Sequence, residues 1–116
     1  MKYMLLLRYP DGAGPQEGTP EFDAEMATWG ALNQELKESG AVITAAGLQP
    51  ETAATTVRTR EGETVLTDGP FAETKELLFS FYVVDLPDLD AATALAARLP
   101  NAAYGSVEVR PLSFVE

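Results

Sequence analysis

The sequence predicts an α+β domain in which two helices cover one face of an antiparallel sheet. Three observations lead to this fold class. The elements follow the order β-α-β, hairpin, β-α-β; both helices carry start and stop signals; and one segment, Leu77–Val84, is apolar on both of its faces. The 116 residues fit one domain, residues 1–116, with enough chain to bury a core.

The two helices are the most clearly bounded elements. The first begins at Thr19, a capping residue, and Pro20, which suits the first helical position, and it ends before Gly40. Its apolar residues recur at spacings of three and four, so they form one stripe expected to face the core: Phe22, Met26, Trp29, Leu32 and Leu36. Asp88 caps the second helix, Leu89–Leu99.

Four strands and a hairpin complete the pattern. The strands are expected at Met1–Tyr9, Ala41–Leu48, Leu77–Val84 and Val107–Arg110, and the hairpin at 55–67 with Glu61-Gly62 at its tip. This order is that of the split βαβ, ferredoxin-like sandwich with an added β-hairpin, a fold of the dimeric α/β-barrel type.

Two helices can cover only one face of such a sheet. The other face would then expose apolar side chains of the first strand and of Leu77–Val84, and monomers seldom expose such a patch. A second copy packed sheet against sheet would cover it. The sequence therefore predicts a homodimer formed through the open sheet face.

Charge and missing residue types exclude several functions. A net charge of −10 argues against binding to nucleic acid or to an anionic membrane. The absence of cysteine and histidine excludes thiol nucleophiles and the usual catalytic triads, and it disfavours zinc. No metal or other cofactor is expected. No targeting segment or membrane span is found, so we expect a cytoplasmic protein.

Asp68 is the candidate catalytic residue. A carboxylate in a turn near the apolar ring of Phe71 could have a raised pKa and act as a general acid or base. The alternative is that Asp68 accepts backbone hydrogen bonds and holds the turn at Gly69-Pro70.

The candidate ligand-binding residues are Arg8, Phe71, Lys75, Tyr82 and Arg110. The three cations could bind a small anionic ligand, and the rings could line a cleft near the turn. Each also has a structural alternative. The arginines could pair with carboxylates, Lys75 could be a solvated charge, and Tyr82 could belong to the core.

Four stretches resemble the DGPF-type branch of the YCII-related superfamily. They are residues 67–76 (TDGPFAETKE), the opening residues 1–6, the step Leu48-Gln49-Pro50 and the ending 104–111. Together they span nearly the whole chain in the expected order, and the ten-residue segment is specific. The resemblance implies a ferredoxin-like sandwich that dimerises through its sheets, in a family that is largely uncharacterised.

The resemblance leaves three functions open. Some members of the wider group carry a histidine near a turn aspartate, which resembles an acid/base pair, but this chain has no histidine. Many DGPF-type relatives are encoded near sigma factors of the extracytoplasmic-function class. We rank first a homodimeric small-molecule-binding or regulatory protein with a cleft near residues 68–71. The alternatives are a cofactor-free enzyme that uses Asp68 and a structural or interaction protein linked to such a sigma factor.

Overall fold

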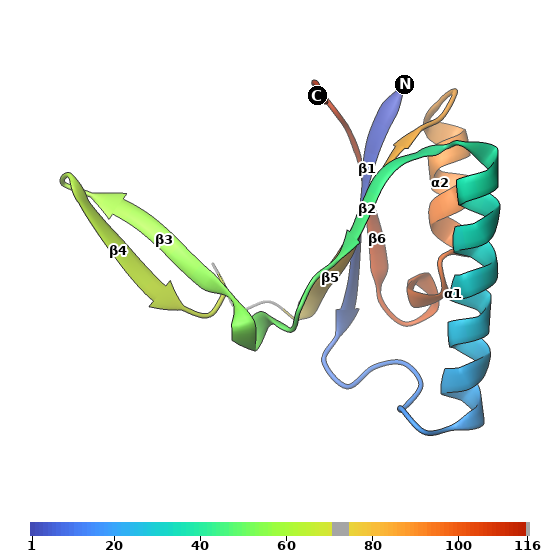
Figure 1. The fold of residues 1–116 in the computed structure, drawn as a ribbon, viewed down its shortest axis with the longest axis horizontal. Helices are drawn as coiled ribbons and strands as arrows, with labels where there is room; N and C mark the ends of the chain where they lie inside the picture. The colour runs from blue at the N-terminus through green and yellow to red at the C-terminus, as the bar shows by residue number, and fades with distance from the viewer. Residues whose placement is uncertain (71–74, 116) are drawn as a thin grey trace.

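The computed structural model describes residues 1–70 and 75–115, and Figure 1 shows how its elements are arranged. Each element that the sequence predicts is present, close to its predicted ends. In chain order the elements are β1 (Lys2–Pro10), α1 (Pro20–Ser39), β2 (Val42–Gly47), the 3-10 helix η1 (Glu51–Ala53), β3 (Thr55–Arg60), β4 (Glu63–Asp68), β5 (Glu76–Asp85), α2 (Leu89–Arg98), the 3-10 helix η2 (Pro100–Ala103) and β6 (Ser106–Pro111).

Four strands form one antiparallel sheet in the order β2-β5-β1-β6. The segment Leu77–Val84 lies in β5, next to β1 at the centre of this sheet, as its apolar character predicts. Both helices cover the same face of the sheet (Figure 1). This arrangement confirms the predicted ferredoxin-like α+β sandwich. Strands β3 and β4 form the added hairpin, which is a separate two-stranded sheet.

Local signals in the sequence set the helix ends. The Thr19 hydroxyl accepts a hydrogen bond from the Phe22 N–H at 3.2 Å, and Asp88 Oδ1 accepts one from the Ala91 N–H at 2.9 Å. Gly40 closes α1 in the left-handed conformation, with a φ of +73°. Within residues 1–70 and 75–115, neither helix has the length and apolar character needed to span a membrane.

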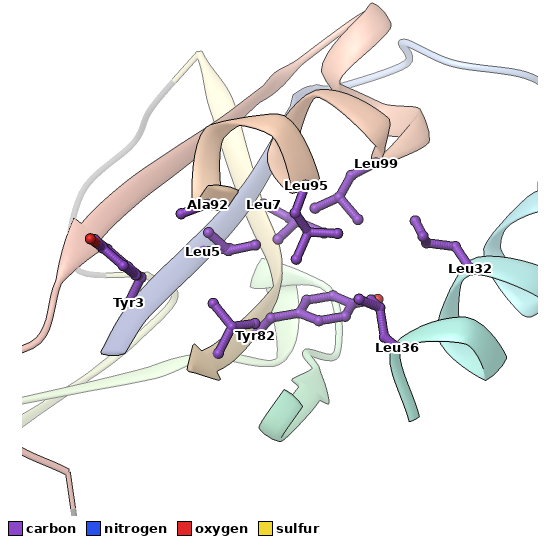
Figure 2. Packing of buried hydrophobic residues seen from close by; sticks show 10 residues of the cluster. Tyr3, Leu5, Leu7, Leu32, Leu36, Tyr82, Ala92, Leu95 and Leu99 are labelled. Atoms are coloured by element: carbon purple, nitrogen blue, oxygen red, sulfur yellow. The ribbon is translucent and has the colours of Figure 1, made fainter. Parts of the chain in front are cut away.

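The core lies between the sheet and the two helices (Figure 2). Alternate residues of β1 point into it and are almost fully buried, and β5 contributes residues from the neighbouring strand. Burying a side chain of this size contributes about 1.5–3 kcal/mol each. The buried cluster consists of Tyr3, Leu5, Leu7, Leu32, Leu36, Tyr82, Val84, Ala92, Leu95 and Leu99.

The expectation that Met26 lies in the core is wrong. Its side chain is 42% exposed, whereas Leu32 and Leu36 further along α1 are buried. The residue directly before it, Glu25, lies toward the body of the protein, because its carboxylate accepts hydrogen bonds from Trp29 and Tyr104. The inward face of α1 is therefore polar at Glu25 and apolar from Trp29 onward, at Leu32 and Leu36.

A β-bulge in β5 changes which side chains face the helices. Leu7 pairs with Ser80 but Arg8 pairs with Leu78, so Phe79 is an extra residue in the ladder. The Phe79 ring packs edge to face against Tyr9 and against Trp29 of α1, with centroid distances of 5.0 and 6.5 Å. The bulge thus brings Phe79 to the helix side of the sheet.

No helix of residues 1–70 and 75–115 covers the other face of the sheet (Figure 1). On this open face Met4 pairs with Val83 and Leu6 with Phe81, in the positions that alternate with the core residues of β1 and β5. Leu78 is exposed, Met4, Leu6 and Phe81 are half-buried, and Val83 is buried. The open face of these two strands is therefore apolar, as predicted, but its residues are exposed to different degrees.

The junction between β1 and β6 leaves no room for a side chain at Gly105. A Cβ there would overlap the carbonyl oxygen of Arg8, and that same oxygen accepts a hydrogen bond from the buried Asn101 side chain at 3.0 Å. Asn101 Nδ2 also donates to the Ser106 carbonyl at 3.0 Å, so this amide joins the end of β1 to the start of β6.

Two glycine substitutions should therefore have opposite effects on stability. Gly105→Ala should lower the free energy of unfolding by about 1–3 kcal/mol, because backbone must move to admit the methyl group. Gly30→Ala, in the middle of α1 with open space around it, should raise it by about 0.5–1 kcal/mol. Urea unfolding followed by circular dichroism measures both. A Gly105→Ala variant as stable as the parent would contradict the packing described here.

Candidate functional site

A groove lies between α1 and the β2 edge of the sheet. It is open to solvent and has a volume of about 420 Å³. Polar side chains from α1 and β5 meet over apolar walls here, which is the composition typical of small-molecule sites. The lining residues are Asn33, Leu36, Lys37, Val42, Ala45, Ala46, Gly47, Ser80 and Tyr82.

One row of side chains on α1 leads to this groove, and its last two members, Asn33 and Lys37, line it. Glu25, Trp29, Asn33 and Lys37 are spaced by four residues, so they follow one another along one side of the helix. A search for apolar stripes does not reveal such a row, because three of its four members are polar. The sequence does contain one signal for this row: Asn33 and Lys37 each come directly after a leucine of the apolar stripe that lies in the core.

Tyr82 lies at the bottom of the groove and is buried. Its hydroxyl donates a hydrogen bond of 2.5 Å to Asn33 Oδ1. Burial raises the pKa of the Tyr82 phenol above its usual value. The phenol therefore stays protonated at neutral pH and acts as a hydrogen-bond donor. Beside it, the Ser80 hydroxyl donates to the Ala46 carbonyl of β2 at 3.0 Å.

At the other end of the row, Glu25 holds two aromatic side chains. Its Oε2 accepts hydrogen bonds from the Tyr104 hydroxyl at 2.9 Å and from the Trp29 indole at 3.3 Å. Burial, together with the Glu25 carboxylate, raises the pKa of Tyr104 to about 12. The loop before α1 passes over this tyrosine at Gly14, where a Cβ would lie 2.8 Å from the ring. This end of the row is closed by tight packing.

Arg8 and Arg110 lie together on the open face of the sheet, around Glu108 of β6. Arg8 Nη1 lies 2.7 Å from Glu108 Oε1, and Arg110 Nε lies 3.8 Å from Glu108 Oε2. Nearby, the Ser106 hydroxyl donates to Glu76 Oε2 at 3.1 Å. The two arginines are thus on the opposite side of the sheet from Tyr82, which points toward the helices.

Asp68 lies on the hairpin rather than on the main sheet. It ends β4 opposite Thr55 and is exposed. The base of the hairpin is closed by Gly69, whose N–H donates to the Ala54 carbonyl at 2.7 Å and whose carbonyl accepts from the Thr56 hydroxyl at 2.8 Å. The φ of +106° at this position requires glycine. The exposure of Asp68 favours the interpretation in which it belongs to the turn.

The remaining two candidates are near the turn in sequence. Lys75 is exposed, and Phe71 lies outside the described residues. Within a single chain, the structure therefore brings Arg8 and Arg110 together, and it separates them from Tyr82 by the sheet. Among residues 1–70 and 75–115, no group of three or more acidic side chains is arranged to hold a metal ion.

A four-stranded antiparallel sheet with two helices on one face defines a small protein of the ferredoxin-like α+β sandwich fold, here with a groove beside the first helix. More particularly, the chain belongs to the YCII-related domain family, whose model matches residues 1–114. An uncharacterised protein of Rhizobium meliloti (strain 1021) is 40% identical over 115 residues, covering 97% of this chain and 93% of that protein. Assignment to the DGPF-type branch stays a prediction from residues 67–76.

Solved structures include a fold relative. The 5-chloro-2-hydroxyhydroquinone dehydrochlorinase of Burkholderia phenoliruptrix AC1100, in complex with 2,5-dihydroxybenzoquinone, matches with a TM-score of 0.52 over 99% of this chain and 96% of that chain. The two sequences are 11% identical, so this likeness shows the fold alone.

The Tyr104–Glu25 contact predicts a specific pH dependence. The pKa of the Tyr104 phenol is about 12 in the folded protein and ordinarily 10.0, so the folded state holds this proton where the unfolded state releases it. Its contribution to stability should be complete below pH 10 and should disappear as the pH rises toward 12. Replacing Glu25→Gln removes the neighbouring charge and should shift the Tyr104 ionisation to lower pH.

A spectrophotometric titration of phenolate absorbance measures this ionisation, and the Tyr104→Phe variant identifies which phase belongs to Tyr104. If the Glu25→Gln variant titrated at the same pH as the parent, the carboxylate would not be the group that holds the proton on Tyr104.

Proposed function

We propose that this protein binds a small molecule in the groove between α1 and the β2 edge of the sheet. The observation that carries the proposal is the convergence of Asn33, Lys37, Ser80 and Tyr82 on one groove of about 420 Å³. Ligand sites are typically about 300–1,000 Å³, with apolar walls and a few polar groups that set the orientation of the ligand.

The lining groups indicate the chemistry of the ligand. The Lys37 ammonium and the Asn33 amide carry hydrogen-bond donors for a ligand, whereas the Ser80 and Tyr82 hydroxyls donate their single protons to Ala46 and Asn33 and offer acceptor oxygens. Leu36 and Val42 supply apolar walls. A compact molecule with an apolar body and anionic or carbonyl oxygens complements this set. In a chain of net charge −10, Lys37 gives the groove a local cation that an anionic ligand needs.

Two features favour binding over acid–base catalysis. The raised pKa keeps the Tyr82 phenol protonated, so it is a poor general base at neutral pH. Asp68, the carboxylate that the enzymatic alternative requires, is exposed on the hairpin. Charged groups suited to catalysis are usually placed in clefts that exclude water.

The fold relative suggests the first compounds to try. Its structure holds 2,5-dihydroxybenzoquinone, a flat ring with oxygen substituents. A ring of this kind combines an apolar face with acceptor oxygens, which is the combination proposed above.

We also propose that a second copy of the chain covers the open face, so that the binding protein is a homodimer.

Removing the cation from the groove should weaken binding. Lys37→Gln should lower the affinity for an anionic probe about tenfold or more, because a hydrogen bond to a charged group contributes about 1.5–3 kcal/mol. Isothermal titration calorimetry with 2,5-dihydroxybenzoquinone and with small aromatic carboxylates measures the effect. Lys2→Gln, which removes the same charge from β1, is the matched control and should bind as the parent does. Equal losses in both variants, or no binding by the parent, would contradict the proposal.

Asp68→Asn distinguishes the groove from a site at the turn. Asp68 is on the hairpin and is not among the residues that line the groove, so the ligand-induced rise in melting temperature should be the same in this variant as in the parent. A thermal-shift assay with the same probes makes the comparison. Loss of the ligand response in a folded Asp68→Asn protein would contradict binding in the groove and favour a site at the turn.

A further inference from the structure

The β3–β4 hairpin projects from the body of the molecule. It leaves the sheet on the side opposite the helices (Figure 1). The radius of gyration is 16.3 Å, whereas a compact chain of this length would have one of about 13 Å. An isolated two-stranded hairpin is at best marginally stable in water, so a projecting hairpin needs another surface to pack against.

The two faces of this hairpin differ. Val57 lies directly opposite Leu66, and their side chains are 60% and 66% exposed. Side chains at directly opposed positions share a face, and successive residues alternate between faces. Val65 therefore lies on the other face, where it is paired with Arg58. The Val57–Leu66 face presents a contiguous apolar pair to solvent.

The length and direction of the hairpin match a second protein layer. Each of its strands has six residues, which gives the hairpin a length of about 20 Å. Packed sheets are about 10 Å apart, so a second sheet stacked on the open face would lie within the reach of the hairpin. The hairpin and the open face thus lie on the same side of the sheet (Figure 1).

We propose that the β3–β4 hairpin is an arm that clasps a second copy of this chain, with the Val57–Leu66 face against the partner. This inference rests on the proposed homodimer and adds the arm to its interface. A two-fold axis makes each copy give one arm and receive one, so a single association covers both exposed surfaces of both copies. No other occupant would cover all four surfaces at once.

Charge also favours a second copy. Asp68 is paired with Thr55 and so shares the face of Val57 and Leu66. On the open face, Arg110 is 68% exposed and lies 3.8 Å from Glu108, which Arg8 already contacts at 2.7 Å. Arg110 can therefore accept a further carboxylate, and the arm of a second copy supplies one. This gives Asp68 a role in association that needs no pocket in its own chain.

Adjacent residues on opposite faces of β4 provide the test. Leu66→Asp places a charge on the docking face, and Val65→Asp makes the same change on the other face at a residue that is 46% exposed. The dissociation constant of the dimer, measured on the full chain by analytical ultracentrifugation, should rise about tenfold or more for Leu66→Asp and change much less for Val65→Asp. Circular dichroism verifies that both variants are folded.

Hydrogen exchange of the parent chain provides a second measurement. Amides of β3 and β4 should lose protection on dilution below the dissociation constant, while those of β1 and β5 keep theirs. Two results would show that the hairpin is not an arm while leaving the homodimer in place. In the first, the parent is a dimer that Leu66→Asp and Val65→Asp weaken equally. In the second, the protection of the hairpin amides does not depend on concentration. A parent chain that stays monomeric overturns both the arm and the homodimer, and none of these results affects the ligand assays at Lys37.

Discussion

The rest of this structure depends on one constraint: the central sheet has two apolar faces, and the two helices can cover only one of them. Strands β1 and β5 lie side by side at the centre of the sheet and alternate apolar residues on both sides. The helices bury only one of these sides, where Tyr3, Leu5 and Leu7 meet the leucines of α1. The open face is a consequence of this imbalance, and the projecting hairpin, a separate two-stranded sheet, adds the exposed side chains of Val57 and Leu66.

The groove has a separate origin in the backbone of β5. The bulge brings Phe79 to the helix side of the sheet, next to Ser80, where it packs against Trp29. Opposite this part of β5, β2 carries the small residues Ala45, Ala46 and Gly47, which leave space between its edge and α1. One row of side chains on α1 explains both features. Trp29 packs against the sheet at one end of the row, whereas Asn33 and Lys37 leave space further along the helix.

The elements could be predicted because their signals are local. Capping by Thr19 and Asp88 and the period of the apolar residues depend on neighbours within a few positions. The site could not be predicted in the same way. Asn33 and Lys37 are ordinary exposed positions of a helix until the edge of β2 lies beside them. The predicted cleft requires Asp68 to lie close to Arg8, and this is possible only if the hairpin folds back onto the sheet. The direction of the hairpin depends on tertiary contacts.

The position of β1 also affects how the chain folds. This first strand lies between β5 and β6, so Tyr3 pairs with Val84 on one side and with Pro111 on the other. Both partners are distant in sequence, and closing such long loops before any pairing energy is gained slows folding. During synthesis, β1 has no strand beside it until β5 has been made, and it lacks its second neighbour until β6 follows. The apolar residues of β1 are then accessible to chaperones for most of the time that translation takes.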